Sequence, residues 1–272
     1  MRSRLPLILA ASAATALLAA CGGGDAELSG ADEPLRVGAS PVPHAEILRF
    51  IDENLAADAG LELEIVEFTD YVQPNVALDD GSLDANYFQT VPYLTEQETS
   101  AGYDFTPLEP VHIEPLGIYS STLTDLAALP DGGTVAIPND PTNAARALRL
   151  LEDNELITLA DTGDAAPTSL DIEFNPKDLQ ISEVEAAQVP RSLADVDIAV
   201  INGNYAIEAD LVPAEDALAL EEAEGNPNAN LLVVRAGDEG DERIIQLEEL
   251  LHSDEVRQFI EDEYQGAVIP AF

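Results

Sequence analysis

Hydrophobic positions along this chain follow two spacings in turn, one typical of strands and one typical of helices. The segment 35–40 is a short apolar run, and 45–59 places apolar residues three and four apart, as a buried helix face does. The segment 61–68 then alternates apolar and polar residues, which favours a half-buried strand. Strands alternating with helices predict an α/β fold in which a mostly parallel sheet carries helices on both faces.

The same alternation starts again after residue 123, which predicts a second α/β unit of similar size. Apolar runs at 134–137, 197–202 and 230–235 predict strands, and 241–264 has the spacing of one or two terminal helices. We therefore expect two lobes with a ligand cleft between them. The predicted boundaries are 35–123 for the first part of lobe 1, 124–229 for lobe 2, and 230–272 for the return to lobe 1.

The segment 137–148 combines a strand end, a turn and a helix start. Its Pro-Asn-Asp-Pro run supplies turn and cap residues, and apolar residues then recur at helical spacing. Asn143 and Arg146 share one face of that helix. Free backbone N–H groups, the helix dipole and a guanidinium together suit a small anion, above all the carboxylate of a free amino acid. The alternative is an ordinary capped helix in which Arg146 makes a surface ion pair.

Aromatic and amide residues gather at predicted strand ends. In open α/β sheets, ligands bind outside the carboxyl ends of strands. Aromatic rings there would enclose an apolar or thioether side chain, and amides with Arg146 would hold the charged ends of an amino acid. Taken singly, each residue has an alternative role in the core, at a helix cap or in a strand. The candidates are Tyr71, Asn86-Tyr87-Phe88-Gln89 just after the predicted third strand, His112, Glu114, Tyr119, Asn202, Asn204 and Tyr205.

Enzyme and metal signatures are scarce. No Gly-x-Ser-x-Gly motif occurs, and the only Gly-rich run, 22–24, follows no strand. The three histidines, His44, His112 and His252, lack the spacing of a metal site. We expect no catalytic residue, no metal and no cofactor.

The N-terminal segment has the features of a secretory signal. Arg2 and Arg4 precede an apolar run, and Leu-Ala-Ala comes directly before Cys21. This pattern matches a bacterial lipobox, which predicts a signal peptide at 1–20 and a lipid on Cys21. The Gly-rich, acidic segment 21–34 would then be a flexible tether to the extracytoplasmic face of the cell membrane. The alternative is a cysteine that merely ends a signal peptide.

The net charge is extreme. The full chain carries −42, and without Arg2 and Arg4 nine basic residues face 53 acidic ones, a charge of −44. Such a surface repels nucleic acid and anionic lipid, so we expect neither as a partner. We interpret the acidic surface as suited to a salty exterior, where counterions screen the repulsion. Compositional drift is the alternative.

Five segments together resemble the methionine-binding lipoproteins of ABC importers, the NlpA-type lipoproteins. The likeness runs from about residue 35 to 272, and Pro-Asn-Asp-Pro-Thr-Asn followed by Arg146 is its most specific part. The segments are Asp84-Ala85-Asn86-Tyr87-Phe88-Gln89 with Val91-Pro92-Tyr93-Leu94, Gly117-Ile118-Tyr119-Ser120, 137–148, Val189-Pro190-Arg191-Ser192-Leu193, and Ala199-Val200-Ile201-Asn202 with Asn204-Tyr205-Ala206.

The resemblance implies a monomeric, non-enzymatic protein with a periplasmic-binding-protein-like fold. It would close over D- or L-methionine and deliver it to a permease with a paired ATPase. Arg146 would take the carboxylate and Asn202 the head group. Further ligand contacts implied are Tyr71, Phe88, Tyr93 and Tyr119 around the side chain, with Asn143, Tyr205 and Asn230 nearby.

One position departs from the family pattern. The family often has His after Phe-Gln, where this chain has Thr90. A missing ring there would widen the pocket or remove a contact. The alternatives for function are therefore another small amino acid or a methionine-containing dipeptide in the same cleft, and, in a different class, a surface-anchored adhesion or signalling lipoprotein.

Overall fold

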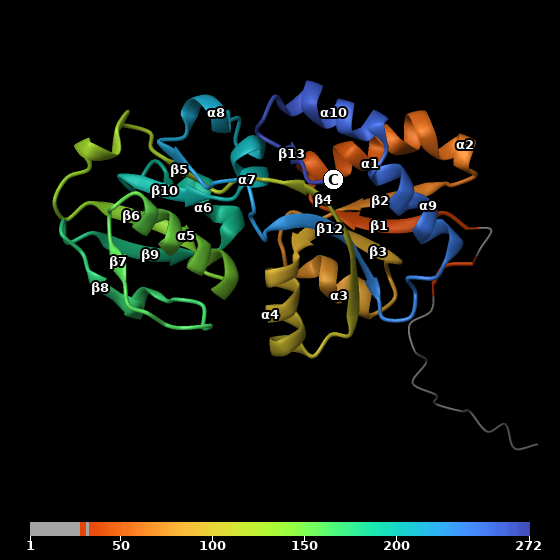
Figure 1. Cartoon of the computed structure of the whole chain (residues 1–272), viewed down its shortest axis with the longest axis horizontal. Helices are drawn as coiled ribbons and strands as arrows, with labels where there is room; N and C mark the ends of the chain where they lie inside the picture. The colour runs from red at the N-terminus through yellow and green to blue at the C-terminus, as the bar shows by residue number, and fades with distance from the viewer. Residues whose placement is uncertain (1–27, 31–32) are drawn as a thin grey trace, which may run out of the picture.

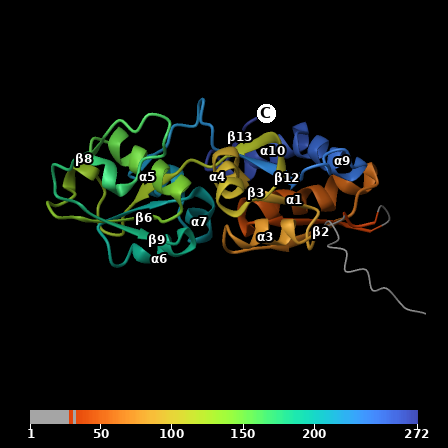
Figure 2. The same ribbon diagram turned by 90° about the horizontal axis from the view of Figure 1, so that it is seen from below.

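The computed structural model describes residues 28–30 and 33–272. The predicted signal peptide and Cys21 lie outside these residues. Two mixed β-sheets, each flanked by helices, lie side by side (Figures 1 and 2), and the predicted α/β class is confirmed. None of the described helices has both the length and the apolar composition that a membrane span requires.

The first sheet has six strands. β1 pairs in parallel with β2 and β3, whereas β12 and β4 run antiparallel to their neighbours. In spatial order the strands are β13 (Ile269–Pro270), β4 (Phe105–Ile113), β12 (Ala229–Arg235), β3 (Ala85–Thr90), β1 (Leu35–Ala39) and β2 (Leu63–Glu67).

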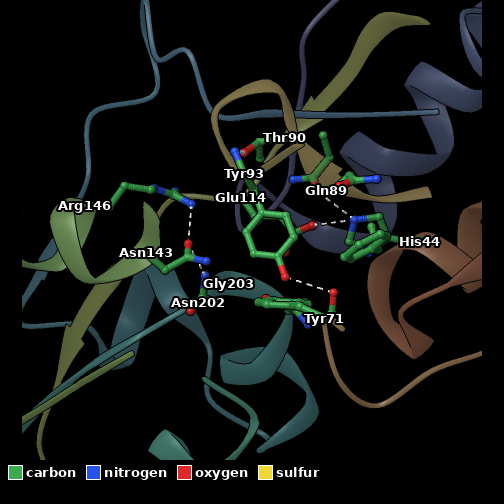
Figure 3. A pocket seen from close by; sticks show the side chains of 13 residues that line it. His44, Tyr71, Gln89, Thr90, Tyr93, Glu114, Asn143, Arg146, Asn202 and Gly203 are labelled. Carbon is green, nitrogen blue, oxygen red and sulfur yellow. Dashed lines mark hydrogen bonds and ion pairs between the residues drawn. The ribbon is translucent and has the colours of Figure 1, made fainter. Parts of the chain in front are cut away.

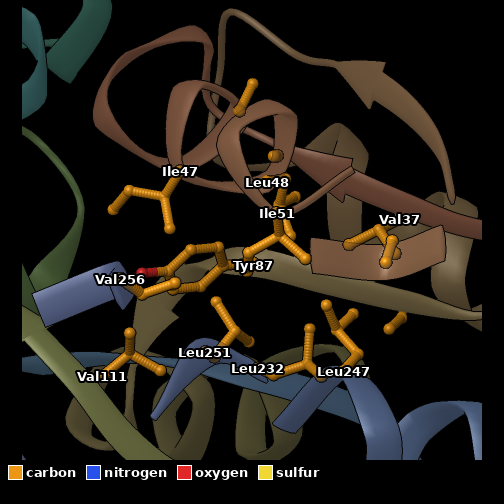
Figure 4. Close-up of a cluster of buried hydrophobic side chains, with 14 of the residues drawn as sticks. Val37, Ile47, Leu48, Ile51, Tyr87, Val111, Leu232, Leu247, Leu251 and Val256 are labelled. Atoms are coloured by element: carbon orange, nitrogen blue, oxygen red, sulfur yellow. The ribbon is translucent and has the colours of Figure 1, made fainter. Parts of the chain in front are cut away.

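Helices cover both faces of this sheet (Figure 1). The helical segment after Val42, whose backbone is extended, includes α1 (Glu46–Ile51) and α2 (Ala57–Ala59), and Gly60 ends it with φ +73°. Figure 4 shows Leu48 and Ile51 of α1 packed with Tyr87 of β3 and with side chains of the two C-terminal helices. The remaining helices are α9 (Glu242–Leu251) and α10 (Asp254–Tyr264) on that face, and α3 (Gln73–Asp79) and α4 (Val91–Ala101) on the other.

The second sheet has five strands, with α5 (Pro141–Asp153) on one face and α6 (Val189–Ser192) and α7 (Gly203–Glu208) on the other. Leu148 and Leu151 of α5 reach the core, as their spacing predicted. In spatial order the strands are β11 (Ala219–Leu220), β5 (Gly117–Tyr119), β10 (Ile198–Ile201), β6 (Thr134–Pro138) and β9 (Gln180–Val184). Smaller elements are η3 (Leu126–Ala128), β7 (Thr158–Leu159), η4 (Ser169–Asp171), β8 (Ile172–Phe174), η5 (Ala186–Gln188) and α8 (Pro213–Asp216).

Two strands differ from the sequence expectation. The prediction missed β4, because Pro107 and Pro110 argue against a strand. The register of β4 with β12 shifts around these prolines, and β13 pairs only with the end of β4 at His112 and Ile113, so the prolines interrupt few ladder hydrogen bonds. The segment 86–89 was predicted to follow the third strand, but it lies within β3, whose residues are all buried and therefore show no alternation.

Both sheets are mixed rather than mostly parallel, since β12, β4 and β5 run antiparallel to their neighbours. The chain passes from the first sheet to the second between β4 and β5, at residues 114–116. It returns to the first sheet with β12, which begins at Ala229. β5 therefore belongs to the second sheet, although it lies within the range 35–123 predicted for lobe 1. The division into lobes stays a prediction.

Candidate ligand-binding site

A pocket lies between the two sheets, where strand ends and helix starts from both halves meet (Figure 3). The first half contributes His44, Tyr71, Phe88, Gln89, Thr90 and Tyr93. The second contributes Asn143, Arg146, Asn202, Gly203 and Asn204. Glu114 of the crossing segment and Asn230 of the returning strand complete the lining.

Among the described residues, Arg146 is the only arginine or lysine that lines the pocket, and the start of α5 positions it. Asp140 caps this helix, since its Oδ1 accepts a hydrogen bond of 2.9 Å from the backbone N–H of Asn143. Arg146 is only 9% exposed, and it pairs with Glu221 through Nε (3.2 Å) and Nη2 (2.6 Å). Arg146 therefore does make an ion pair, as the alternative interpretation proposed, but the pair is nearly buried beside the pocket rather than on the surface.

Amide side chains form a chain of hydrogen bonds that begins at Arg146. Asn143 Oδ1 accepts from Arg146 Nη1 at 3.2 Å and from Asn202 Nδ2 at 2.9 Å. In contrast, Asn202 Oδ1 and Asn204 Nδ2 are buried and have no hydrogen-bond partner among the described residues. A buried polar atom without a partner is costly, so these two atoms suit a polar ligand.

Aromatic rings form one wall of the pocket. Tyr71 lies 6.0 Å from Phe88 and 5.9 Å from Tyr93, measured between ring centroids. Tyr71 also packs against Tyr205 of the other half at 4.9 Å, and its hydroxyl donates to Asn204 Oδ1 at 2.5 Å. The wall is therefore apolar toward the pocket, and it joins the two halves.

Glu114 lies close to two imidazoles. His112 Nε2 hydrogen-bonds to its Oε1 at 2.7 Å, whereas His44 Nε2 lies 3.2 Å from the same oxygen and hydrogen-bonds to Asn230 Oδ1 at 3.0 Å. Burial lowers the pKa of His44 to about 4 and that of His112 to about 3, so both rings are neutral at pH 7. Burial also raises the pKa of Glu114, although the interaction with His44, a hydrogen bond from the backbone N–H of Asn204 and the charge of Arg146 oppose this.

The same three residues could offer ligand atoms to a metal ion, because the candidate atoms lie within 4.8 Å of one another. Sequence spacing gave no sign of this group, because His44 lies about 70 residues before His112 and Glu114 along the chain. In the structure His112 Nε2 hydrogen-bonds to Glu114, and His44 Nε2 lies 3.2 Å from the same carboxylate oxygen.

The structure brings together seven of the ten predicted site residues. Three others lie outside the pocket lining. His112 lies behind Glu114, Tyr205 supports Tyr71, and Tyr119 is a core residue 1% exposed, as its alternative reading proposed. The residues within the lining are Tyr71, Phe88, Tyr93, Asn143, Arg146, Asn202 and Asn230.

Sequence reasoning missed two lining residues, His44 and Gly203. His44 follows Pro43 at the start of the first helical segment, where no local pattern marks it. Gly203 carried a weak signal, because it adjoins a predicted segment. A Cβ at residue 203 would lie 2.7 Å from Glu114 Cβ, so this contact requires glycine. Gln89, Glu114 and Asn204 also line the pocket; they were named among the strand-end residues but not among the ligand contacts that the resemblance implies.

Comparison with known proteins finds relatives over most of the chain. The chain is 40% identical over 258 residues to the methionine-binding lipoprotein MetQ of Bacillus subtilis, which covers 93% of both chains. It is 41% identical over 222 residues to the D-methionine-binding lipoprotein MetQ of Escherichia coli, covering 80% of this chain and 82% of that one.

Solved structures share the fold. A nutrient-binding protein from Burkholderia cenocepacia bound to methionine is 44% identical, with a TM-score of 0.85 over 88% of this chain and 100% of that one. A periplasmic substrate-binding protein of an ABC transporter from Coxiella burnetii is 43% identical, with a TM-score of 0.83 over 87% and 100%. The model of the NlpA lipoprotein family matches residues 35–272, the range over which the sequence resemblance was drawn. The chain therefore belongs to the NlpA lipoprotein family, a family of substrate-binding proteins rather than enzymes.

Proposed function

We propose that this protein is the lipid-anchored, extracytoplasmic substrate-binding component of an ABC importer and that it binds methionine between its two halves. The observation that carries the proposal is one buried pocket whose lining includes the guanidinium of Arg146, the acidic side chain of Glu114 and a wall of aromatic rings. A free amino acid with an apolar side chain carries the complementary groups.

Each part of a methionine zwitterion has a partner in the pocket. Its carboxylate would accept hydrogen bonds from Arg146, whose guanidinium has five N–H donors and uses three of them within the protein. Its ammonium group would lie near Glu114 and donate to Asn202 Oδ1, which has no partner among the described residues. Its thioether would pack against Tyr71, Phe88 and Tyr93, since sulfur contacts aromatic rings favourably.

Binding would couple to closure of the two lobes. Tyr71 and Glu114 contact the second half at Asn204 and Gly203, so these contacts would open and re-form as the cleft does. A ligand favours the closed form only through its better affinity for that form. The closed surface would be recognised by a permease with its ATPase, and the proposed lipid on Cys21 would keep the protein at the membrane.

A second candidate ligand is another small amino acid or a methionine-containing dipeptide. Thr90 favours this candidate, because the family often has His at this position and Thr90 lines the pocket while it caps α4. Thr90 Oγ1 accepts from the backbone N–H of Tyr93 at 3.4 Å, so its side chain is fixed at the pocket edge.

Native mass spectrometry on the chain without residues 1–21 tests the proposal. The spectrum is recorded before and after a denaturation and refolding step. We expect a bound mass of methionine that disappears on refolding and returns when D- or L-methionine is added. A protein that ignores methionine but is stabilised by another amino acid or dipeptide keeps the fold and changes the ligand. Indifference to every small solute supports the adhesion or signalling role.

A further inference from the structure

Glu221 holds the guanidinium that the proposed function assigns to the ligand carboxylate. Its two oxygens accept from Arg146 Nε at 3.2 Å and Nη2 at 2.6 Å. The Glu221 side chain is 19% exposed and the Arg146 side chain 9%, so water screens the pair weakly. Burial raises the pKa of Glu221, but the hydrogen bond and charge of Arg146 outweigh it, and the pKa lies below its usual range. Glu221 is therefore a carboxylate at neutral pH.

The contacts of Arg146 leave one edge of its guanidinium for a ligand. A guanidinium can grip a carboxylate through its side edge, Nε with Nη2, or through its end, Nη1 with Nη2. Glu221 occupies the side edge, and Nη1 donates one hydrogen bond to Asn143. One N–H on each terminal nitrogen remains to donate to a ligand carboxylate.

Glu221 is itself fixed by the backbone of the crossing segment. Its N–H donates to Leu116 O at 2.8 Å, and its Oε2 accepts from Leu116 N at 3.3 Å. Glu221 directly follows β11, which pairs with β5, so the carboxylate, the segment before β5 and Arg146 all belong to the second half. The ion pair does not depend on contact between the two halves.

We propose that Glu221 is a positioning residue for ligand recognition. It occupies the side edge of Arg146 and directs the end of the guanidinium into the pocket before the ligand arrives. This inference rests on the proposed function, because it requires a ligand carboxylate at Arg146. Immobilising a long side chain in advance lowers the entropic cost of binding by an amount that corresponds to at most about tenfold in affinity.

Two other roles for the pair lead to different results. A purely structural ion pair would stabilise the fold without acting through the ligand carboxylate. A competing carboxylate would repel the ligand, and its removal would tighten binding. The three roles therefore differ in the sign of the affinity change and in whether the change depends on Arg146 and on the ligand carboxylate.

The test is calorimetry on the chain without residues 1–21, with L-methionine and with methioninol, which keeps the ammonium and thioether but lacks the carboxylate. The variants are Glu221→Gln and a matched control, Glu222→Gln, which removes the same charge from the exposed neighbouring residue. Both are repeated with Arg146→Lys, because an ammonium has no edges to orient. Thermal melts and circular dichroism check the fold, and Glu221→Asp replaces Glu221→Gln if the latter does not fold.

We expect Glu221→Gln to weaken methionine binding about fivefold to tenfold, and Glu222→Gln to leave it unchanged. The loss should fall below about twofold with methioninol and in the Arg146→Lys background. Unchanged or tighter binding in a folded Glu221→Gln protein overturns the inference, as does an equal loss with methioninol. If the unmodified protein does not bind methionine, the proposed ligand is wrong, and the same variants are compared with the carboxylate ligand that does bind.

Discussion

Hydrogen bonding separates the polar residues of the pocket into two kinds. Asn143 is fully engaged, because its amide contacts Asp140, Arg146 and Asn202. Asn202 Oδ1 and Asn204 Nδ2 are buried and have no partner among the described residues. Native interiors rarely leave such atoms unpaired, so the unpaired set marks where ligand groups should lie. Asn143, whose hydrogen bonds are all made within the protein, holds Arg146 and Asn202 in position beside these atoms.

Replacing Arg146 tests the most important of these residues. Arg146→Ala should remove most methionine binding, because a ligand carboxylate left unpaired in a buried pocket costs on the order of 2–5 kcal/mol, or about 30-fold or more in Kd. Arg149→Ala is a matched control, since Arg149 is exposed on the same helix one turn later. Isothermal titration calorimetry gives both values. Equal Kd values for Arg146→Ala and the unmodified protein would refute the assigned role.

His44 makes a prediction about pH. Its pKa is about 4 in the folded protein, against about 6.5 in an unfolded chain, because burial disfavours the charged ring. The unfolded state therefore takes up a proton as the pH falls through 6.5, while the folded state does not until about pH 4. Stability that depends on neutral His44 is present above pH 6.5 and is lost as the pH falls toward 4.

The variant His44→Gln isolates this effect from the many carboxylates. The difference in unfolding free energy between the unmodified protein and His44→Gln should shift by about 2 kcal/mol in favour of the variant between pH 7 and pH 4.5. Denaturant titrations at fixed, high salt measure both proteins across this range. A difference that stays constant with pH would mean that His44 is not kept neutral by burial.

At the level of elements, local sequence signals predicted the helices and strands in which propensity and spacing agree with the final structure. The strand, turn and helix start at 134–148 carry prolines, a cap and helical spacing, and the structure has β6 and α5 there. Prediction missed β4, whose prolines contradict a strand, and it ended β3 too early because a fully buried strand shows no alternation. In both cases the neighbouring strands, rather than local sequence, decide the outcome.

The cap of α5 should matter for binding as well as for stability. Asp140→Ala removes the bonds to the backbone N–H and the side-chain amide of Asn143, and losing a cap costs about 1 kcal/mol. Asn143 would then lose its fixed position beside Arg146, so methionine affinity should also fall several-fold. The control is Ser253→Ala, which removes the cap of α10. Denaturation and calorimetry should show both variants destabilised, with binding weakened only in Asp140→Ala.

At the level of the whole molecule, the pocket depends on residues that the sequence keeps far apart. Arg146, Asn143 and Asn202 were found through motifs within short segments. His44 and Glu221 were not, and neither was the proximity of His44 to Glu114, because these arrangements arise only when the crossing segment, the first helix and β11 meet. Tyr119 shows the opposite error. It belongs to a family motif at a strand end and was predicted to contact the ligand, but it lies in a hydrophobic core. The family resemblance identified site residues within short sequence motifs. Residues whose position depends on contacts between distant segments could be identified only in the structure.

Charge acts on the whole molecule, and salt should reveal it. Without Arg2 and Arg4, nine basic residues face 53 acidic ones, and Arg36, Arg49, Arg146, Arg235 and Arg243 are already in ion pairs with carboxylates. Most carboxylates therefore repel one another, and unfolding relieves that repulsion by spreading the charges. Screening by salt should stabilise the folded state more than the unfolded chain.

The expected result is a Tm at pH 7.5 that rises by at least about 5 °C between 0.05 M and 1 M KCl, since about 1–2 kcal/mol of relieved repulsion shifts the Tm of a protein of this size by that amount. Chloride is preferred to sulfate, because sulfate strengthens burial of any surface. The sequence isoelectric point is about 4.1, so the same salt series near that pH is the control, and its effect should nearly vanish there. An equal Tm at low and high KCl at pH 7.5 would instead support compositional drift, because a surface that gains nothing from counterions has no physical need of a salty exterior.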